Sequence, residues 1–153
     1  MENVSNLESL DTNTLKLLLK NAMDKKREEA QGDFLKFVKT VWPEFVEGKH
    51  HTIYAEKLNR IANGELKRLI VNMPPRHTKS EFASNLFPAF YMGRHPKAKL
   101  IQTTHTGELA IRFGRKAKNM IESSEYEKVF PEVTLAADSK AAGRWESNHG
   151  GEY

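Results

Sequence analysis

A lysine and a serine, Lys79 and Ser80, stand between a short apolar stretch and a helix-like stretch. In phosphate-binding loops of the pattern G-x-x-x-x-G-K-[ST], the lysine reaches the β- and γ-phosphates of a nucleotide and the hydroxyl binds Mg²⁺. Laid over "MPPRHTKS", this pattern places Met73 and Thr78 where its two glycines stand. The residues therefore allow two interpretations, a phosphate-binding loop without glycines or a basic loop that leads into a helix.

Two short apolar runs frame the elements that must position this loop. Residues 67–73, "KRLIVNM", and residues 99–105, "KLIQTTH", are each followed by a helix-like segment. Continuous apolar runs of this length are typical of buried strands, and strand–helix alternation is typical of parallel sheets. The alternation predicts an α/β fold, a mostly parallel sheet with covering helices. With the phosphate-loop interpretation of Lys79 and Ser80, this fold would be of the P-loop NTPase type. Ligands of such folds bind at the carboxyl ends of the strands, where the loop and residues 102–105 would lie.

Helices are predicted ahead of the sheet, where apolar residues recur at three- and four-residue spacing. We expect their apolar residues, Leu18 and Met23 among them, to pack into the core. Asp11 or Thr12 is the expected cap of the first helix. Near the end of the chain, "RWESNHGGEY" predicts a β-hairpin. The helices cover residues 12–30, 34–42 and 52–62, and the hairpin covers residues 144–153 with its turn at 148–151.

The composition is that of a folded chain. Its 153 residues are enough for one domain, 39% of them are hydrophobic, 29% are charged, and the mean hydropathy is −0.64. No apolar run approaches the roughly 20 residues that a membrane span needs, and we expect no secretory signal and no membrane partner. The absence of cysteine excludes disulfides and thiolate metal sites. The spacing of His77, His95 and His105 does not match a zinc site.

Positive charge is concentrated in one part of the chain. The whole chain has a net charge of +4, whereas residues 67–118 carry eleven Lys or Arg against two Glu, a net charge of +9. This window favours a surface for the phosphates of a nucleotide or a nucleic acid, and the alternative is an ordinary solvated face. The same alternatives apply to the basic residues of the second covering helix, Arg112, Arg115, Lys116 and Lys118.

The stretch "NMPPRHTKSE" resembles the deviant Walker A motif of bacteriophage terminase large subunits. These are ATP-driven motors that pump DNA into procapsids, and a "PPRHGKSE"-like form occurs in them. The flanking segments "GKHHTIYAEKLNRIANGELKRLIVNMPPR" and "KLIQTTHTGELAIRFGRKAKNMI" are also similar to those of the family. The resemblance covers roughly residues 34–153. It implies ATP and Mg²⁺ as cofactors.

The resemblance also implies roles for individual residues. Lys79 would bind the β- and γ-phosphates and Ser80 the Mg²⁺, while Arg76 lies where the family has an arginine whose bidentate fork suits a γ-phosphate. Arg76 and Lys79 would be the catalytic residues. His50 and His51 lie where the family recognises adenine, and the alternative is an ordinary surface histidine pair. The nucleotide-binding set comprises His51, Pro75, Arg76, His77, Thr78, Lys79, Ser80 and Glu81.

Thr78 departs from the family pattern, in which this position is glycine. A β-branched residue resists positive φ and prevents close approach of the backbone to a ligand. Two outcomes are therefore open. Either the loop keeps a negative φ at Thr78, or nucleotide binding is weak.

Half of the chemistry of ATP hydrolysis is missing from the sequence. Phosphoryl transfer to water also needs a carboxylate for Mg²⁺ and a group that orients the water. No apolar run ends in Asp-Glu or Asp-Asp, and neither Glu81 nor Glu108 follows such a run. We therefore expect the N-terminal ATP-binding portion of a motor, without the acidic strand and the nuclease domain. Residues 1–63 would be its helical segment, and residues 64–153 would be an incomplete P-loop ATPase domain.

Further properties follow from the resemblance alone. It implies double-stranded DNA, a portal protein and a small terminase subunit as partners, a ring of identical subunits, and the host cytoplasm as location. Two alternatives stay open at this point. One is another P-loop ATPase, such as a helicase-like enzyme, and the other is a non-catalytic basic module that binds nucleic acid or a partner protein.

Overall fold

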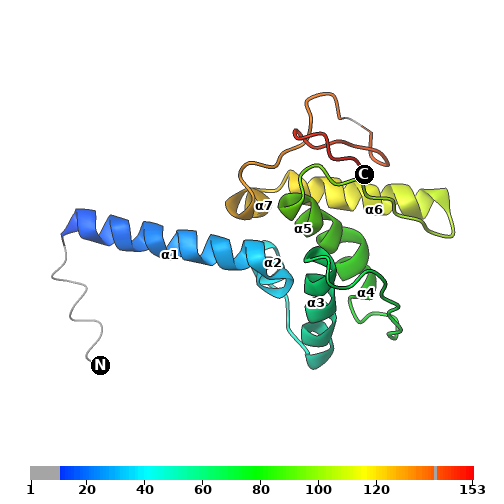
Figure 1. The fold of residues 1–153 in the computed structure, drawn as a ribbon, viewed down its shortest axis with the longest axis horizontal. Helices are drawn as coiled ribbons and strands as arrows, with labels where there is room; N and C mark the ends of the chain where they lie inside the picture. The colour runs from blue at the N-terminus through cyan, green and yellow to red at the C-terminus, as the bar shows by residue number, and fades with distance from the viewer. Residues whose placement is uncertain (1–10, 140) are drawn as a thin grey trace.

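The computed structural model describes residues 11–139 and 141–153, which form helices joined by loops (Figure 1). The run from α4 to α5 is continuous and contains one π-helical turn, η1. In chain order the elements are α1 (Thr12–Gly32), α2 (Phe34–Val41), α3 (Lys49–Ala62), α4 (Lys79–Glu81), η1 (Phe82–Leu86), α5 (Phe87–Arg94), α6 (Gly107–Ile121) and α7 (Ser124–Val129).

The first three helices confirm the sequence prediction with small changes at their ends. Asp11 caps α1, because its Oδ1 accepts a hydrogen bond from the N–H of Thr14 at 2.6 Å. Asp33 starts α2 in the same way, accepting from the N–H of Lys36 at 2.9 Å. The third helix begins at Lys49, earlier than predicted. The histidine pair that precedes residue 52 therefore lies inside the first turn of α3.

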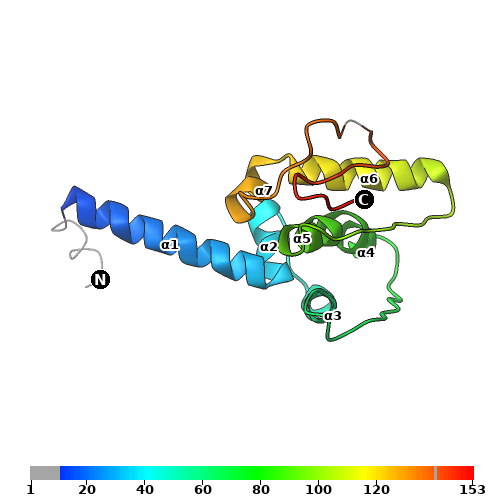
Figure 2. The same ribbon diagram turned by 45° about the horizontal axis from the view of Figure 1, so that its top comes forward.

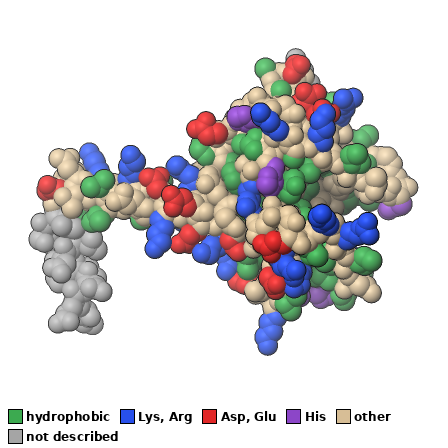
Figure 3. Space-filling model, in the orientation of Figure 1, with side chains coloured by type: hydrophobic (Ala, Val, Ile, Leu, Met, Phe, Trp, Pro, Cys, Tyr) green, Lys and Arg blue, Asp and Glu red, His purple; other side chains and the backbone are tan. Residues whose placement is uncertain are grey.

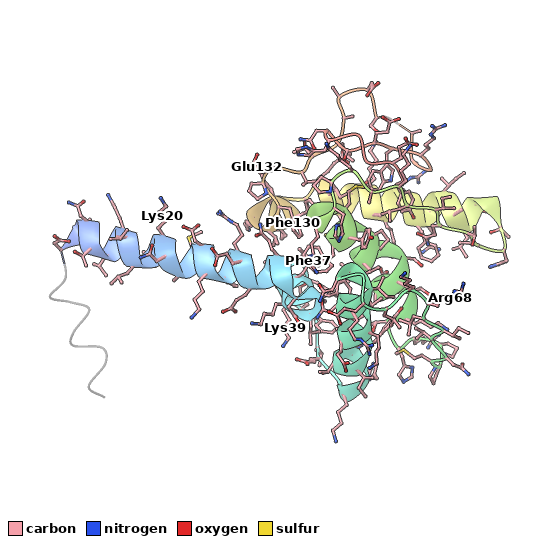
Figure 4. All side chains as sticks on the ribbon, in the orientation of Figure 1. Lys20, Phe37, Lys39, Arg68, Phe130 and Glu132 are labelled. Atoms are coloured by element: carbon pink, nitrogen blue, oxygen red, sulfur yellow. The ribbon has the colours of Figure 1, made fainter. Side chains whose placement is uncertain are left out.

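Aromatic side chains from several elements form the centre of the core. Phe34 and Phe37 come from α2, Phe82 from η1, Phe90 from α5, and Phe130 from the end of α7, and all five are buried. The ring centroids of Phe34 and Phe82 lie 5.2 Å apart, and those of Phe37 and Phe130 lie 5.9 Å apart. Figure 4 labels Phe37 and Phe130. These edge and tilted contacts join α2, the helix after the loop and α7 into one body.

Helix α1 projects from this body and contacts it only near its C-terminal end (Figure 1). There the Gln31 side chain donates to the carbonyl of Val129 at 2.7 Å, and Ala30 is the one buried residue of the helix. The prediction that Leu18 and Met23 pack into the core is wrong, because both are exposed. No described helix, α1 included, is long and apolar enough to cross a membrane.

The predicted parallel sheet is absent from the described residues, so the α/β assignment is wrong and the fold is helical. Within residues 11–139 and 141–153, strand-type pairing is limited to isolated bridges, of which Lys99 with Glu152 is the only parallel one. Residues 67–73 make no backbone-to-backbone hydrogen bond within the described part of the chain. In the second predicted strand, the backbone N–H of Leu100 donates to the carbonyl of Glu152. Residues 101–105 make no backbone-to-backbone hydrogen bond with any described residue.

The failure of the sheet prediction has a physical reason. Apolar β-branched residues disfavour helix locally, and both segments are indeed non-helical connections, to α4 and to α6 (Figure 2). A strand, however, exists only when a second segment bonds to it. Residues 67–73 have no such partner among the described residues, and residues 99–105 pair with Glu152 only at Lys99 and Leu100. The side chains of Ile70 and Ile101 are 96% and 92% exposed.

The C-terminal hairpin prediction is confirmed. Trp145 and Tyr153 exchange backbone hydrogen bonds of 3.2 and 2.9 Å, and the N–H of Ser147 donates to the carbonyl of Gly151 at 2.8 Å. Gly151 is therefore paired, and the turn lies at residues 148–150. The indole N–H of Trp145 donates to the carbonyl of Gly114 at 3.1 Å, which anchors the hairpin to α6.

The exposed isoleucines generate a prediction about association. Unpaired backbone next to exposed apolar side chains favours contact between chains, so we expect the protein to self-associate at micromolar concentration. Ile70→Thr combined with Ile101→Thr should reduce this association, as measured by sedimentation velocity. Ile53→Thr is the matched control, because Ile53 is also exposed but lies in the hydrogen-bonded helix α3. A parent chain that stays monomeric would contradict the prediction.

Candidate phosphate-binding loop

The loop ahead of α4 has an unusual backbone. Among the described non-glycine residues only Arg76, with φ of 63°, and Thr78, with φ of 56°, have positive φ. Thr78 is also the N-cap of α4, since its carbonyl accepts from the N–H of Phe82 at 2.9 Å. The sequence left open a negative φ at Thr78, and that alternative is wrong. The other alternative, weak nucleotide binding, stays a prediction.

Lys79 and Ser80 lie together at the start of the helix that follows the loop. The ammonium of Lys79 turns back over the loop and donates to the carbonyl of Met73 at 3.3 Å, while Ser80 is exposed. Both residues line a hollow of about 430 Å³ whose other walls include Tyr54 of α3 and Leu69. The motif thus brings a cation, a hydroxyl and a cavity to one place.

The remaining residues of the loop face solvent. Pro75, Arg76 and His77 are exposed, and the Nδ1–H of His77 donates to the carbonyl of Pro75 at 2.9 Å. Arg76 forms no ion pair with any residue that the structure describes. Its guanidinium is therefore available to a ligand at the loop.

His51 lies against the loop from the first turn of α3 and is only 6% exposed. Its Nδ1 accepts from the N–H of Gly48 at 2.9 Å, and its Nε2 lies 2.5 Å from the hydroxyl oxygen of Thr78. Because Nδ1 is an acceptor, the neutral ring carries its proton on Nε2 and donates to Thr78. Both ring nitrogens are thus engaged inside the chain.

The surroundings of His51 favour this neutral form. Burial lowers the pKa of His51 below its ordinary value, and positive charge on His50 and, to a smaller extent, on His77 acts in the same direction. Glu47 opposes the shift. The ring centroids of His50 and His51 lie 3.8 Å apart, and those of His50 and His77 lie 5.5 Å apart.

Glu81 is the one residue of the predicted nucleotide-binding set that is engaged away from the loop. It forms an ion pair with Lys116 of α6 and accepts from the side-chain amide of Asn85 at 3.0 Å. Lys116 is therefore not part of a free basic face, although Arg112 and Arg115 of the same helix are exposed. Nothing in the spacing of the sequence indicated the contact, because the two residues are 35 positions apart.

Other candidate residues do not join the loop. Gln102, at the end of the second predicted strand, accepts a hydrogen bond from the hydroxyl of Tyr153 in the hairpin. Within residues 11–139 and 141–153, no three histidine or acidic side chains group as a metal site. A hollow of about 810 Å³ lies between the C-terminal part of α1, the end of α5 and residues 130–133, which follow α7, but its residues Arg27 and Arg94 already donate hydrogen bonds within the chain.

Sequence reasoning missed the support that His51 gives to Thr78. One signal was present, because a threonine in place of a left-handed glycine needs a neighbour that stabilises its conformation. The neighbour itself could not be identified from spacing.

No protein-family model, no curated protein and no solved structure matches this chain, so the interpretation of the loop rests on its own residues and geometry.

Proposed function

We propose that the chain binds Mg-ATP through residues 74–80, as the N-terminal ATP-binding portion of a motor of the terminase large-subunit type. The observation that carries the proposal is the pair of left-handed residues, Arg76 and Thr78, directly before Lys79 and Ser80. The resemblance of "PPRHTKSE" to the family's loop supports the same function.

The backbone argument is independent of the resemblance. Left-handed residues that alternate with ordinary ones turn peptide N–H groups toward a common point, and such concavities bind anions. Non-glycine residues in this conformation cluster at functional sites, because they persist only where surrounding contacts specify them. Arg76 and Thr78 stand on either side of His77, whose φ is not positive. This alternation of φ signs supports an anion site at the loop.

The side chains fit a phosphate better than any partner they have now. Lys79 donates to the neutral carbonyl of Met73 over 3.3 Å, which is a long hydrogen bond. Charge-assisted bonds to phosphate oxygens are shorter and stronger, so a nucleotide would displace the carbonyl. Arg76 is exposed beside it, and its planar fork can bind a γ-phosphate through two parallel bonds.

Magnesium fits this site only together with a nucleotide. Ser80 offers one exposed hydroxyl oxygen, and Glu81 is already paired with Lys116. Mg²⁺ prefers six oxygen ligands and is usually held by one or two carboxylates with substrate phosphates and water. Ser80 would thus supply one ligand and the phosphates the others, and the metal would contribute charge neutralisation at those phosphates.

The alternative of a non-catalytic nucleic-acid module is less well supported. Lysines of the basic window are already bonded within the chain, for example Lys99 to Glu152 at 2.8 Å and Lys118 to the carbonyl of Ser139 at 2.7 Å. Basic and acidic side chains are interspersed on the face shown in Figure 3. A continuous basic surface, which strong phosphate-backbone binding needs, is not visible on that face.

Lys79→Ala should weaken binding of a fluorescent ATP analogue in the presence of Mg²⁺ by at least about tenfold, because hydrogen bonds to charged groups contribute roughly 1.5–3 kcal/mol. Lys97→Ala is the matched control, since it removes an exposed lysine of the same basic window outside the loop. Equal affinity of the parent and Lys79→Ala would refute the assignment of the loop.

We also predict that the chain binds ATP without hydrolysing it at an enzymatic rate, with or without DNA. The nearest acidic residue in the chain, Glu81, is occupied by Lys116 and Asn85 and cannot orient water. Phosphate release should be measured on monodisperse protein beside Lys79→Ala. Lysine-dependent release above about one turnover per second, an ordinary enzymatic rate, would show that a carboxylate completes the site.

A further inference from the structure

Thr78 holds a backbone conformation that its own side chain opposes. Its φ of 56° and ψ of 8° lie in the left-handed region, which β-branched residues avoid because Cβ crowds the backbone there. A residue keeps such a conformation only where its surroundings specify it. The contacts of the Thr78 side chain therefore identify what holds the loop.

The hydroxyl of Thr78 belongs to a chain of hydrogen bonds that begins in α3. The N–H of Gly48 donates to Nδ1 of His51 at 2.9 Å, and Nε2–H of His51 donates to Oγ1 of Thr78 at 2.5 Å. Oγ1 in turn donates to the carbonyl of His77 at 2.7 Å. Every group in this chain has a consistent donor or acceptor role, so the rotamer of Thr78 is fixed.

Packing keeps the ring of His51 in position. The ring centroid of Phe45 lies 4.8 Å away and that of Phe82 lies 5.3 Å away. His51 is buried against both rings, whose own centroids lie 5.7 Å apart, and cannot turn its Nε2–H toward another acceptor without breaking these contacts. The contact with Thr78 spans 27 positions of the chain and joins α3 to the loop.

We propose that His51 is a positioning residue whose Nε2–H holds Thr78 in the left-handed conformation that glycine adopts unaided. This hydrogen bond, here called the latch, stabilises a positive φ that glycine would adopt without any partner. The consequence for phosphate binding rests on the proposed function, whereas the latch itself is testable without nucleotide. His51 contacts no phosphate in this role and acts through Thr78.

A double-mutant cycle between His51 and Thr78 tests the latch. His51→Leu removes the donor, and Thr78→Gly removes the side chain that needs it. We expect His51→Leu to lower the free energy of unfolding less in the Thr78→Gly chain than in the parent. It should also weaken binding of the ATP analogue about fivefold in the parent, a factor typical of residues in contact, and hardly at all in the Thr78→Gly chain. Thr78→Gly alone should leave binding intact or tighten it.

Two further variants serve as controls for the cycle. His51→Gln keeps a donor near the position of Nε2 and should restore most of the binding. His95→Leu removes a ring that bonds the carbonyl of Ala62 at 2.9 Å, away from the loop, and should be additive with Thr78→Gly. Where His51→Leu does not fold, His51→Asn, whose side chain is too short to reach Thr78, takes its place.

The possible outcomes separate the latch from the proposed function. Additive unfolding free energies for His51 and Thr78 would overturn the latch, even if the chain binds nucleotide. Coupled unfolding with additive binding would overturn the positioning role. If the parent and Lys79→Ala bind nucleotide equally, the proposed function fails, and the unfolding cycle still decides whether the latch exists.

The hydrogen bond from Gly48 to His51 predicts a pH dependence, because a protonated His51 loses Nδ1 as an acceptor, whereas its Nε2–H can still donate to Thr78. The charged groups that face its ring are His50 of α3, His77 of the loop, and Glu47, which Lys39 of α2 holds at 2.6 Å. Burial lowers the pKa of His51 in the folded chain, so the unfolded chain binds the proton first as the pH falls. The stabilisation is complete above about pH 6.5 and is lost as the pH falls through the lower pKa of the folded chain.

The contribution of His51 to this pH dependence is the difference between the unfolding free energies of the parent and of a variant that does not titrate at position 51. Unfolding free energies of the parent and His51→Gln should be compared between about pH 7.5 and pH 5, the range in which histidine titrates. The parent should lose more stability than His51→Gln as the pH is lowered, because glutamine does not titrate. Parallel profiles would show that the neutral His51 ring is not required.

Discussion

The buried ring of Phe82 is the contact on which the loop depends. Phe82 follows the first turn after the loop, and its centroid lies 5.2 Å from Phe34 of α2, 5.7 Å from Tyr54 of α3 and 5.3 Å from His51. Aromatic contacts at such distances stabilise beyond the burial of their area. Because one side chain joins the helix after the loop to both α2 and α3, the C-terminal end of the loop has a fixed base.

Side chains in the first turn of the helix after the loop point to different neighbours, since an α-helix turns about 100° per residue. Lys79 returns to the carbonyl of Met73, Glu81 pairs with Lys116 of α6, and Phe82 enters the core. The carboxylate that could neutralise the cation at the loop is thereby held on another side of the helix. The same geometry that keeps Lys79 at the loop, bonded to a neutral carbonyl, holds Glu81 against α6.

The helices were predictable and the sheet was not, for one reason. Caps and apolar spacing act within one or two turns, so Asp11 and the periodicity located the first three helices to within three residues. The composition of residues 67–73 correctly excluded a helix, but a strand requires a second segment elsewhere in the chain, and none bonds to it among the described residues. Leu18 shows the same limit, because spacing defines a helix face without showing what covers it.

The motif likewise identified the residues of the loop but not how the loop is held. The type of residue at 78 favours a negative φ, and the hydrogen bond from His51 accounts for the positive φ of Thr78. A glycine would adopt the left-handed conformation by itself, whereas a threonine does so while a donor stands against its hydroxyl. Positions 51 and 78 are therefore constrained as a pair. A motif that evaluates each position separately rejects Thr78, because the residue that makes it acceptable lies on another helix.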